Sequence, residues 1–321
     1  MRAIPLIPLL LGGWLSVPAH AADDASKWLE RLTQAEQQQS FQGTFVYERL
    51  YERSASFSTH DIWHLASNGK VSERVLQLDG SAQEVVRAEG RTQCVSGALV
   101  SGVNTAPDAA GRVFDPLKLM SWYDLSVAGE SRVAGRDAVI VTLVPKDQYR
   151  YGFELHLDRQ TALPLKSLLL TDHGQLLERF QFTRFDTATP SDADMRPSEN
   201  CNRVTQAVAA GKPPTASGWR SDWLPPGFEL TTSSVRKGAQ SKAAVSSYMY
   251  DDGLARFSVF LEPLNGAAAV DTRTQIGPTA AVSRRLTTPK GEVMVTVVGE
   301  IPIGTAERIA LSMRPQDSNV R

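Results

Sequence analysis

The chain has 321 residues, and its 34 lysine and arginine side chains against 35 aspartate and glutamate side chains give a formal net charge of −1. This balance offers no basic excess for nucleic acid, and no run of like charge indicates a polyelectrolyte tail. The length predicts about two domains, each large enough to bury a hydrophobic core.

Residues 1–21 have the three parts of a secretory signal peptide. Arg2 precedes an apolar run from Ala3 to Val17, and Ala19-His20-Ala21 matches an A-x-A cleavage site. The run contains prolines and glycines and is shorter than the roughly 20 apolar residues of a membrane-spanning helix. No cysteine follows the expected cut, which argues against a lipid anchor. We therefore expect an exported protein that is soluble outside the cytoplasm.

One helix and then strands are predicted next. Asp23 or Asp24 can cap a helix that ends at residues 37–40, with one apolar face formed by Trp28, Leu29, Leu32 and Ala35. Residues 44–51 and 56–65 are rich in β-branched and aromatic residues and predict strands. Asn68-Gly69 and Asp79-Gly80 are strong hairpin signals.

Residues 101–119 have neither the helical nor the strand period and contain several glycines and prolines. They predict a long loop, which can be a lid or binding element or, equally, a surface insertion without a role. Beyond it, residues 151–157, 163–170 and 176–185 predict three strands. The short turns between these strands require antiparallel pairing.

Cys94 and Cys201 are the two cysteines of the chain. In an oxidising compartment a disulfide between them is the simplest interpretation, and two buried thiols are the alternative. The bond would close a loop of about 100 residues, worth at most roughly 4–5 kcal/mol in the chain-entropy model.

A composition shift predicts a domain boundary. Residues 204–218 are small, contain proline and lack large apolar side chains, as expected of a linker. Strand patterns resume near residues 228–230, 244–250, 255–261, 280–286 and 293–298, and Pro302 starts a closing helix. We expect a signal peptide (1–21), an N-terminal domain (22–203), the linker (204–218), a small α+β C-terminal domain (219–316) and a tail (317–321).

Catalytic motifs are not apparent. The sequence has no G-x-S-x-G, H-E-x-x-H, C-x-x-C or P-loop pattern. His60 and His64 would share one face of a strand, but a pair without an obvious third ligand is weak for a metal site. We expect no enzyme, no metal and no cofactor.

The strands carry large apolar residues at consecutive positions, so both faces of a sheet could be partly dry. The helix could cover one face, and the other could line a concave cavity for an apolar ligand such as an acyl chain. The alternative is that the helix, the loop and the second domain fill this space.

Three groups of residues resemble the MucB/RseB family, whose members are periplasmic negative regulators of an extracytoplasmic-stress sigma factor. Residues 35–51, including Ser40 to Tyr47, are similar to its first helix and strand. Residues 157–166, 172–174 and 180–183 are similar to its central strands. Residues 223–228, 248–254 and 298–302 are similar to its smaller C-terminal domain. The matches occur in the family's order and extend through both expected domains.

The resemblance implies a mainly β, α+β protein located in the periplasm. Its N-terminal domain would be an open antiparallel β-barrel of the LolA/LppX type wrapped around helices, followed by a smaller α+β domain. The implied partner is the periplasmic region of a membrane-spanning anti-sigma factor of the MucA/RseA type, shielded from a site-one protease. Lipid or lipopolysaccharide would promote release, and in members called MucB the pathway controls alginate production. A homo-oligomer remains open, and no nucleic acid is expected.

Candidate site residues follow from this picture, although any of them can instead be plain core. Candidates for the apolar cavity are Phe45, Tyr47, Trp63, Leu65, Trp122, Phe153, Leu155, Leu168, Phe180 and Phe182. Aromatic side chains often anchor interfaces, and the candidates for partner binding are Trp219, Trp223, Tyr248, Tyr250, Phe257 and Phe260. The main rival function is a periplasmic lipid or lipoprotein carrier, which would have no need of the second domain.

Overall fold

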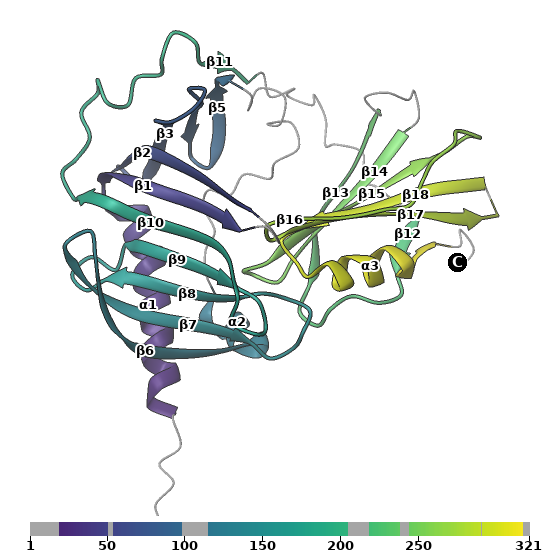
Figure 1. Cartoon of the computed structure of the whole chain (residues 1–321), viewed down its shortest axis with the longest axis horizontal. Helices are drawn as coiled ribbons and strands as arrows, with labels where there is room; N and C mark the ends of the chain where they lie inside the picture. The colour runs from purple at the N-terminus through teal and green to yellow at the C-terminus, as the bar shows by residue number, and fades with distance from the viewer. Residues whose placement is uncertain are drawn as a thin grey trace, which may run out of the picture.

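The computed structural model describes residues 19–50, 54–97, 115–204, 218–237, 244–289 and 291–316. These parts contain three helices and nineteen strands. Most of the predicted signal peptide (residues 1–18), most of the predicted loop (98–114) and most of the predicted linker (205–217) lie outside the described residues. The described elements form two units, which are adjacent in Figure 1.

The N-terminal domain is built on one antiparallel sheet of eleven strands in the order β11-β5-β4-β3-β2-β1-β10-β9-β8-β7-β6. The strands are β1 (Phe41–Leu50), β2 (Ala55–Ser67), β3 (Lys70–Gln77), β4 (Glu84–Ala88), β5 (Arg91–Val95), β6 (Tyr123–Val133), β7 (Arg136–Pro145), β8 (Gly152–Asp158), β9 (Pro164–Leu170), β10 (Leu176–Asp186) and β11 (Asn202–Arg203). Strand β1 pairs with β10, which joins the first and the later strands into one sheet. The sheet curls but is not closed, because β6 and β11 are its two edges.

Helix α1 (Ala19–Gln38) crosses the concave face of this sheet. Its apolar side chains Ala25, Leu29 and Leu32 are fully or almost fully buried against β6, β7 and β8. The helix begins earlier than predicted, so Asp23 and Asp24 lie inside it rather than at its cap. Alanines at 19, 21 and 22 favour this extension in the uncleaved chain, because alanine has the highest helix propensity.

A second helix, α2 (Pro116–Trp122), replaces the end of the predicted loop. Proline at its first position is pre-organised for a helix, and the Asp115 carboxylate accepts a hydrogen bond from the Lys118 backbone amide at 3.1 Å. The prediction of a loop through residue 119 was therefore wrong over its last residues. The sequence signal was present in Asp115-Pro116, a cap followed by proline.

The C-terminal domain has a six-stranded antiparallel sheet in the order β13-β14-β15-β18-β17-β16. Its strands are β13 (Glu229–Lys237), β14 (Ala244–Asp251), β15 (Arg256–Pro263), β16 (Thr272–Ile276), β17 (Thr279–Thr288) and β18 (Gly291–Gly299). Helix α3 (Ile303–Ser312) packs on one face of the sheet, and the short strands β12 (Trp219–Ser221) and β19 (Met313–Pro315) pair beside it. The mainly β, α+β fold with a large open sheet and a smaller second domain is confirmed.

Two local predictions are confirmed at residue level. Asn68 and Gly69 have φ angles of 52° and 73°, as a two-residue hairpin turn of type I′ requires. Cys94 and Cys201 form a disulfide with their Cα atoms 5.5 Å apart, which ties the chain just before residue 204 to β5, the neighbour of the edge strand β11. The Asp79-Gly80 signal corresponds instead to a longer connection between β3 and β4, where the Asp79 carboxylate accepts from the Thr59 amide at 2.7 Å.

Candidate ligand pocket and domain interface

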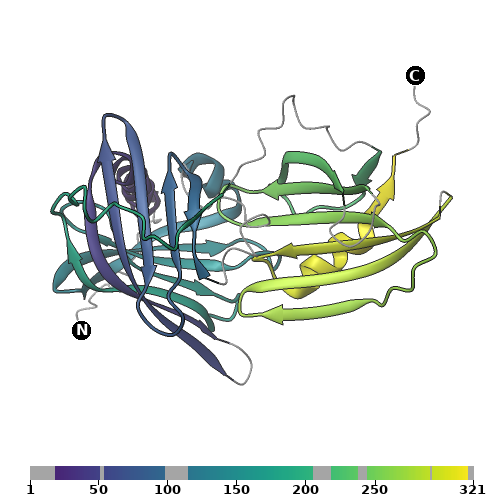
Figure 2. The same ribbon diagram turned by 90° about the horizontal axis from the view of Figure 1, so that it is seen from above.

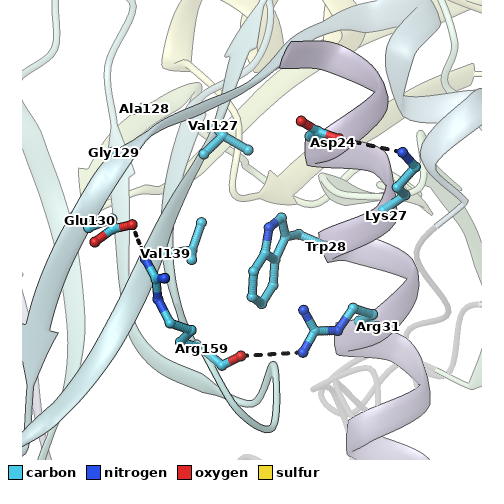
Figure 3. A pocket seen from close by; sticks show the side chains of 10 residues that line it. All are labelled: Asp24, Lys27, Trp28, Arg31, Val127, Ala128, Gly129, Glu130, Val139 and Arg159. Atoms are coloured by element: carbon cyan, nitrogen blue, oxygen red, sulfur yellow. Dashed lines mark hydrogen bonds and ion pairs between the residues drawn. The ribbon is translucent and has the colours of Figure 1, made fainter. Parts of the chain in front are cut away.

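A cavity of about 580 Å³ lies between α1, the edge strand β6 and its neighbour β7. We call it the α1–β6 pocket. Its apolar lining is formed by Trp28 of α1, Val127 of β6 and Val139 of β7. Figure 3 shows the Trp28 indole facing these two valines across the cavity. The space opposite the α1 side chains remains open because the β6 residues there, Ala128 and Gly129, are small.

Charged side chains surround the mouth of the α1–β6 pocket. The cations are Lys27, Arg31 and Arg159, and the anions are Asp24 and Glu130. Lys27 pairs with Asp24 at 3.4 Å, and Arg159 pairs with Glu130 (Figure 3). Arg31 has no carboxylate partner among the pocket residues: it donates to the Arg159 and Gln160 carbonyls and lies 4.1 Å from the Trp28 ring. The lining therefore combines an apolar floor with an excess of one positive charge.

The ten residues predicted to line a cavity lie elsewhere. Phe45, Tyr47, Phe180 and Phe182 pack in an apolar cluster between α1 and the β1–β10 part of the sheet, and Leu155, Phe153 and Trp122 belong to the cluster beneath α1 and α2. Trp63, Leu65 and Leu168 are half-buried. None of the ten lines the α1–β6 pocket, and Phe153 lines a separate hollow of about 200 Å³. Sequence reasoning missed Trp28, Val127 and Val139 as cavity residues because it assigned Trp28 to the covered face of the helix.

The residues predicted to bind a partner divide into two groups. Tyr248, Tyr250 and Phe257 are at most 5% exposed and fill the core of the C-terminal domain. Trp219, Trp223 and Phe260 are half-buried and accessible in part. Among the six, only Trp219, Trp223 and Phe260 therefore have surface that a partner can contact.

Trp223 lies at the contact between the two domains. Its ring packs edge to face against Tyr149 of the β7–β8 connection, with the ring centroids 5.1 Å apart. The Arg308 guanidinium of α3 lies 3.8 Å from the Trp223 centroid and also donates to the Tyr149 hydroxyl at 3.2 Å. Elsewhere between the two domains, Lys118 of α2 forms an ion pair with Glu229 at 2.9 Å. Trp223, which was predicted to bind a partner protein, is thus already in contact with the N-terminal domain.

A titratable cluster lies under the far end of α1. His64 is 3% exposed, and its ring nitrogens lie 3.0 Å from the Glu73 carboxylate and 2.8 Å from the Glu36 carbonyl oxygen. Burial, followed by the negative charge of Glu73, raises the pKa of the Glu36 carboxyl to about 7, although His64 opposes this shift. His60, the second histidine of the predicted pair, contacts Ser58 at 2.8 Å and stacks on Phe45. The two histidines therefore have separate partners.

Within the described residues, no helix has the length and apolar character needed to cross a membrane. No group of three or more histidine, cysteine, aspartate or glutamate residues in the same parts of the chain has the arrangement of a metal site.

Comparisons with known proteins cover both domains. The family model described as the MucB/RseB N-terminal domain matches residues 24–200, and the MucB/RseB C-terminal domain matches residues 213–314. The sigma factor AlgU regulatory protein MucB of Pseudomonas aeruginosa is 57% identical over 318 residues, which cover 98% of each chain.

Solved structures of MucB match as well. The crystal structure of MucB in complex with MucA(peri) has a TM-score of 0.79 at 56% identity, covering 92% of this chain and all of the other. The crystal structure of MucB alone has a TM-score of 0.68 at 55% identity, covering 92% of this chain and 98% of the other.

Proposed function

Because this chain belongs to the MucB/RseB family of regulatory proteins, we propose that it restrains a sigma factor of the AlgU type from the periplasm by binding a membrane-spanning anti-sigma factor of the MucA type. The observation on which this proposal rests is the 57% identity to MucB across 98% of both chains. The match to MucB in its complex with MucA(peri) favours the same partner. An exported protein cannot touch a cytoplasmic sigma factor, so its control requires such a membrane-spanning intermediary.

The proposed mechanism is protection from proteolysis. Binding of the periplasmic region of the anti-sigma factor at the surface between the two domains would cover the segment that a site-one protease must reach. Half-buried aromatic residues suit such a surface, and Trp219 and Phe260 of the C-terminal domain are the candidates without a role in the domain contact described above. Release of the partner would then expose the cleavage segment and free the sigma factor.

The proposed release signal is an acidic amphiphile, such as lipopolysaccharide or another anionic lipid, bound in the α1–β6 pocket. The apolar floor formed by Trp28, Val127 and Val139 suits an acyl chain, and Arg31 and Lys27 at the mouth suit a phosphate or carboxylate headgroup. Each methylene removed from water contributes about 0.8 kcal/mol, so a chain of ordinary length gives roughly 10 kcal/mol before ordering costs. Ligand binding would favour a state with lower affinity for the anti-sigma factor.

Titration calorimetry with the purified mature protein and the periplasmic fragment of MucA tests this function. The affinity is measured alone, with lipopolysaccharide, with phosphatidylglycerol vesicles and with neutral phosphatidylcholine vesicles. We expect binding in the absence of lipid, weaker binding with the two anionic lipids, and no effect of phosphatidylcholine. Absence of binding in every condition would refute the regulatory function, and lipid binding without fragment binding would indicate the rival carrier function.

Two variants locate the lipid site. Ala128→Trp adds a large ring at the β6 side of the α1–β6 pocket, and Ala128→Ser is its matched control. The tryptophan variant should still bind and protect the MucA fragment from the site-one protease, with the lipid effect lost. An unchanged lipid effect in Ala128→Trp would place the lipid site elsewhere.

A further inference from the structure

The connection between β7 and β8, residues 146–151, contacts the C-terminal domain through three consecutive side chains. Tyr149 contacts Trp223 and α3, as described above. The Tyr151 hydroxyl accepts a hydrogen bond from the Gln275 amide of β16 at 3.3 Å. Arg150, between them, contacts two further segments of the C-terminal domain. Since these partners come from separate parts of that domain, the connection restrains its position in more than one direction.

Arg150 is fully buried at this interface. Its guanidinium donates to the Asp252 carboxylate at 2.5 Å, to the Asp147 carboxylate at 2.9 Å and to the Pro226 carbonyl. The Tyr123 hydroxyl donates to the same Asp252 oxygen at 3.2 Å, and Asp252 is also fully buried. We call Arg150, Asp147, Asp252 and Tyr123 the Arg150 cluster. Two of its charged members, Arg150 and Asp252, belong to different domains, so the cluster spans the interface.

Aromatic rings exclude water from the Arg150 cluster. The guanidinium carbon lies between 5.1 and 5.7 Å from the ring centroids of Trp122, Tyr123 and Phe228. If the Arg150–Asp252 pair separated, Arg150 would keep Asp147, whereas the buried Asp252 would lose the cation that it contacts, which is strongly unfavourable without hydration. The domains therefore have a closed arrangement with Arg150 and Asp252 paired, and any open arrangement must hydrate Asp252. Two discrete arrangements of this kind are what a switch requires.

Leu254 connects the Arg150 cluster to the α1–β6 pocket. This residue follows Asp252 by two positions and is 4% exposed, yet it packs in the apolar cluster of the N-terminal domain with Leu119 and Tyr123. The same apolar cluster includes the pocket residues Trp28, Val127 and Val139. Continuous apolar contacts consequently extend from the floor of the pocket to the turn that holds Asp252.

We propose that Arg150 is the positioning residue that sets the angle between the two domains, and that a molecule in the α1–β6 pocket displaces the Asp252–Leu254 turn from it. The regulatory part of this inference rests on the proposed function: the closed arrangement binds the anti-sigma factor, and the open one does not. The described structure has a TM-score of 0.79 with MucB in its complex and 0.68 with MucB alone, at nearly equal identity and coverage. The described chain as a whole, in which the Arg150 cluster is closed, is thus more similar to MucB in the complex than to MucB alone.

The test uses Asp252→Asn and a matched control, Asp251→Asn. The Asp252 Oδ1 accepts from the Leu254 and Ala255 amides, and asparagine can keep these bonds while it removes the charge that faces Arg150. The neighbouring Asp251 pairs with Arg256 inside the C-terminal domain. Each protein carries two fluorophores, attached to cysteines introduced at the exposed residues Thr183 and Leu311, so that energy transfer reports the domain arrangement without any anti-sigma factor.

We expect phosphatidylglycerol vesicles to change energy transfer in the wild type and in Asp251→Asn. Asp252→Asn should show the changed value before lipid is added and respond no further. Affinity for the MucA fragment should change with lipid by roughly 5- to 150-fold in the wild type, the usual range of allosteric coupling, and by less than about twofold in Asp252→Asn.

Wild-type energy transfer and a full lipid response in Asp252→Asn would overturn the inference, as would an absence of lipid response in every protein. Failure of the MucA fragment to bind would refute the proposed function alone, because the energy-transfer measurement does not use it. If Asp252→Asn does not fold, Tyr123→Phe replaces it, since it removes only the hydroxyl that donates to Asp252. That variant should shift energy transfer in the same direction by a smaller amount, and no shift would count against the inference.

Discussion

At the scale of single residues, Glu36 makes the stability of the protein depend on pH. Burial and the charge of Glu73 raise its pKa from 4.5 to about 7 in the folded protein. In the unfolded chain the carboxyl ionises near its ordinary pKa, so the unfolded state loses a proton first and stability falls as the pH rises from about 4.5 to 7. Above pH 7 this contribution is constant.

Glu36→Gln should remove this loss. We expect the variant to unfold with a free energy about 1–3 kcal/mol higher than the wild type at pH 8, and with a similar free energy at pH 4.5. Urea unfolding at a series of pH values measures the difference. Glu30→Gln, at an exposed position on the same helix, is the control and should follow the wild type. Parallel pH profiles for wild type and Glu36→Gln would contradict the prediction.

Position 227 requires glycine for two reasons, the backbone conformation and the close contact at the domain interface. Its φ angle is +86°, and a Cβ atom there would overlap the Trp122 ring, which covers Arg150. We expect Gly227→Ala to lower the unfolding free energy by about 2–4 kcal/mol, the sum of backbone strain and overpacking.

Gly218 supplies the control for that measurement, because its φ is +94° and nothing lies within 4 Å of the position that an added methyl group would take. Gly218→Ala should cost only the backbone part, about 1 kcal/mol. Equal losses in denaturant unfolding for the two variants would show that Trp122 yields freely to the added methyl group.

At the scale of elements, the disulfide holds the end of the N-terminal domain against the sheet. Cys94 and Cys201 are 107 residues apart in sequence, and β11 pairs with β5 over only two residues. Replacing both cysteines by serine should lower the unfolding free energy by about 2–4 kcal/mol. Hydrogen exchange should accelerate first at β11 and β5. Unaccelerated exchange at these strands in the double variant would mean that their pairing does not depend on the bond.

The sequence predicted some elements well because their signals are local. Strands β8, β9 and β10 are short runs rich in apolar residues and are joined by short turns, so local sequence patterns located them. The hairpin of β6 and β7 also has a local signal, the turn at Ala134 and Gly135 with φ angles of 49° and 78° between apolar alternating runs, and it was overlooked. Its absence from the prediction hid the strand edge that forms the α1–β6 pocket.

The interface could not be predicted because it depends on distant pairs. Arg150 and Asp252 are 102 residues apart, and an isolated arginine or an Asp-Asp-Gly turn normally indicates exposed chain. Leu254 ends a segment, residues 248–254, that was assigned to the C-terminal domain, whereas its side chain packs in the N-terminal cluster. The family resemblance supplied the expected fold and class of partner. The residues that face the pocket could be identified only once the structure showed how α1 lies relative to β6.

At the scale of the whole molecule, the shared apolar cluster should make the two domains unfold together. Leu254→Ala truncates the side chain that the C-terminal domain contributes to that cluster and should lower the unfolding free energy by about 2–4 kcal/mol. Calorimetry of this variant should show two separated transitions where the wild type shows one. Leu261→Ala, which is equally buried but lies wholly within the C-terminal core, should lower stability without separating the transitions. Identical thermograms for the two variants would contradict domain coupling through Leu254.

The position of the disulfide has a mechanical consequence. A pulling force on the C-terminal domain acts along the chain to residue 204 and then meets Cys201, which is bonded covalently to Cys94 of β5. The bond gives the tension a short covalent path into β5, beside the edge strand β11, so the stretch from residue 187 to 200 carries less of it. A membrane-anchored partner that pulls on the C-terminal domain would therefore not first extend residues 187–200 of the N-terminal domain.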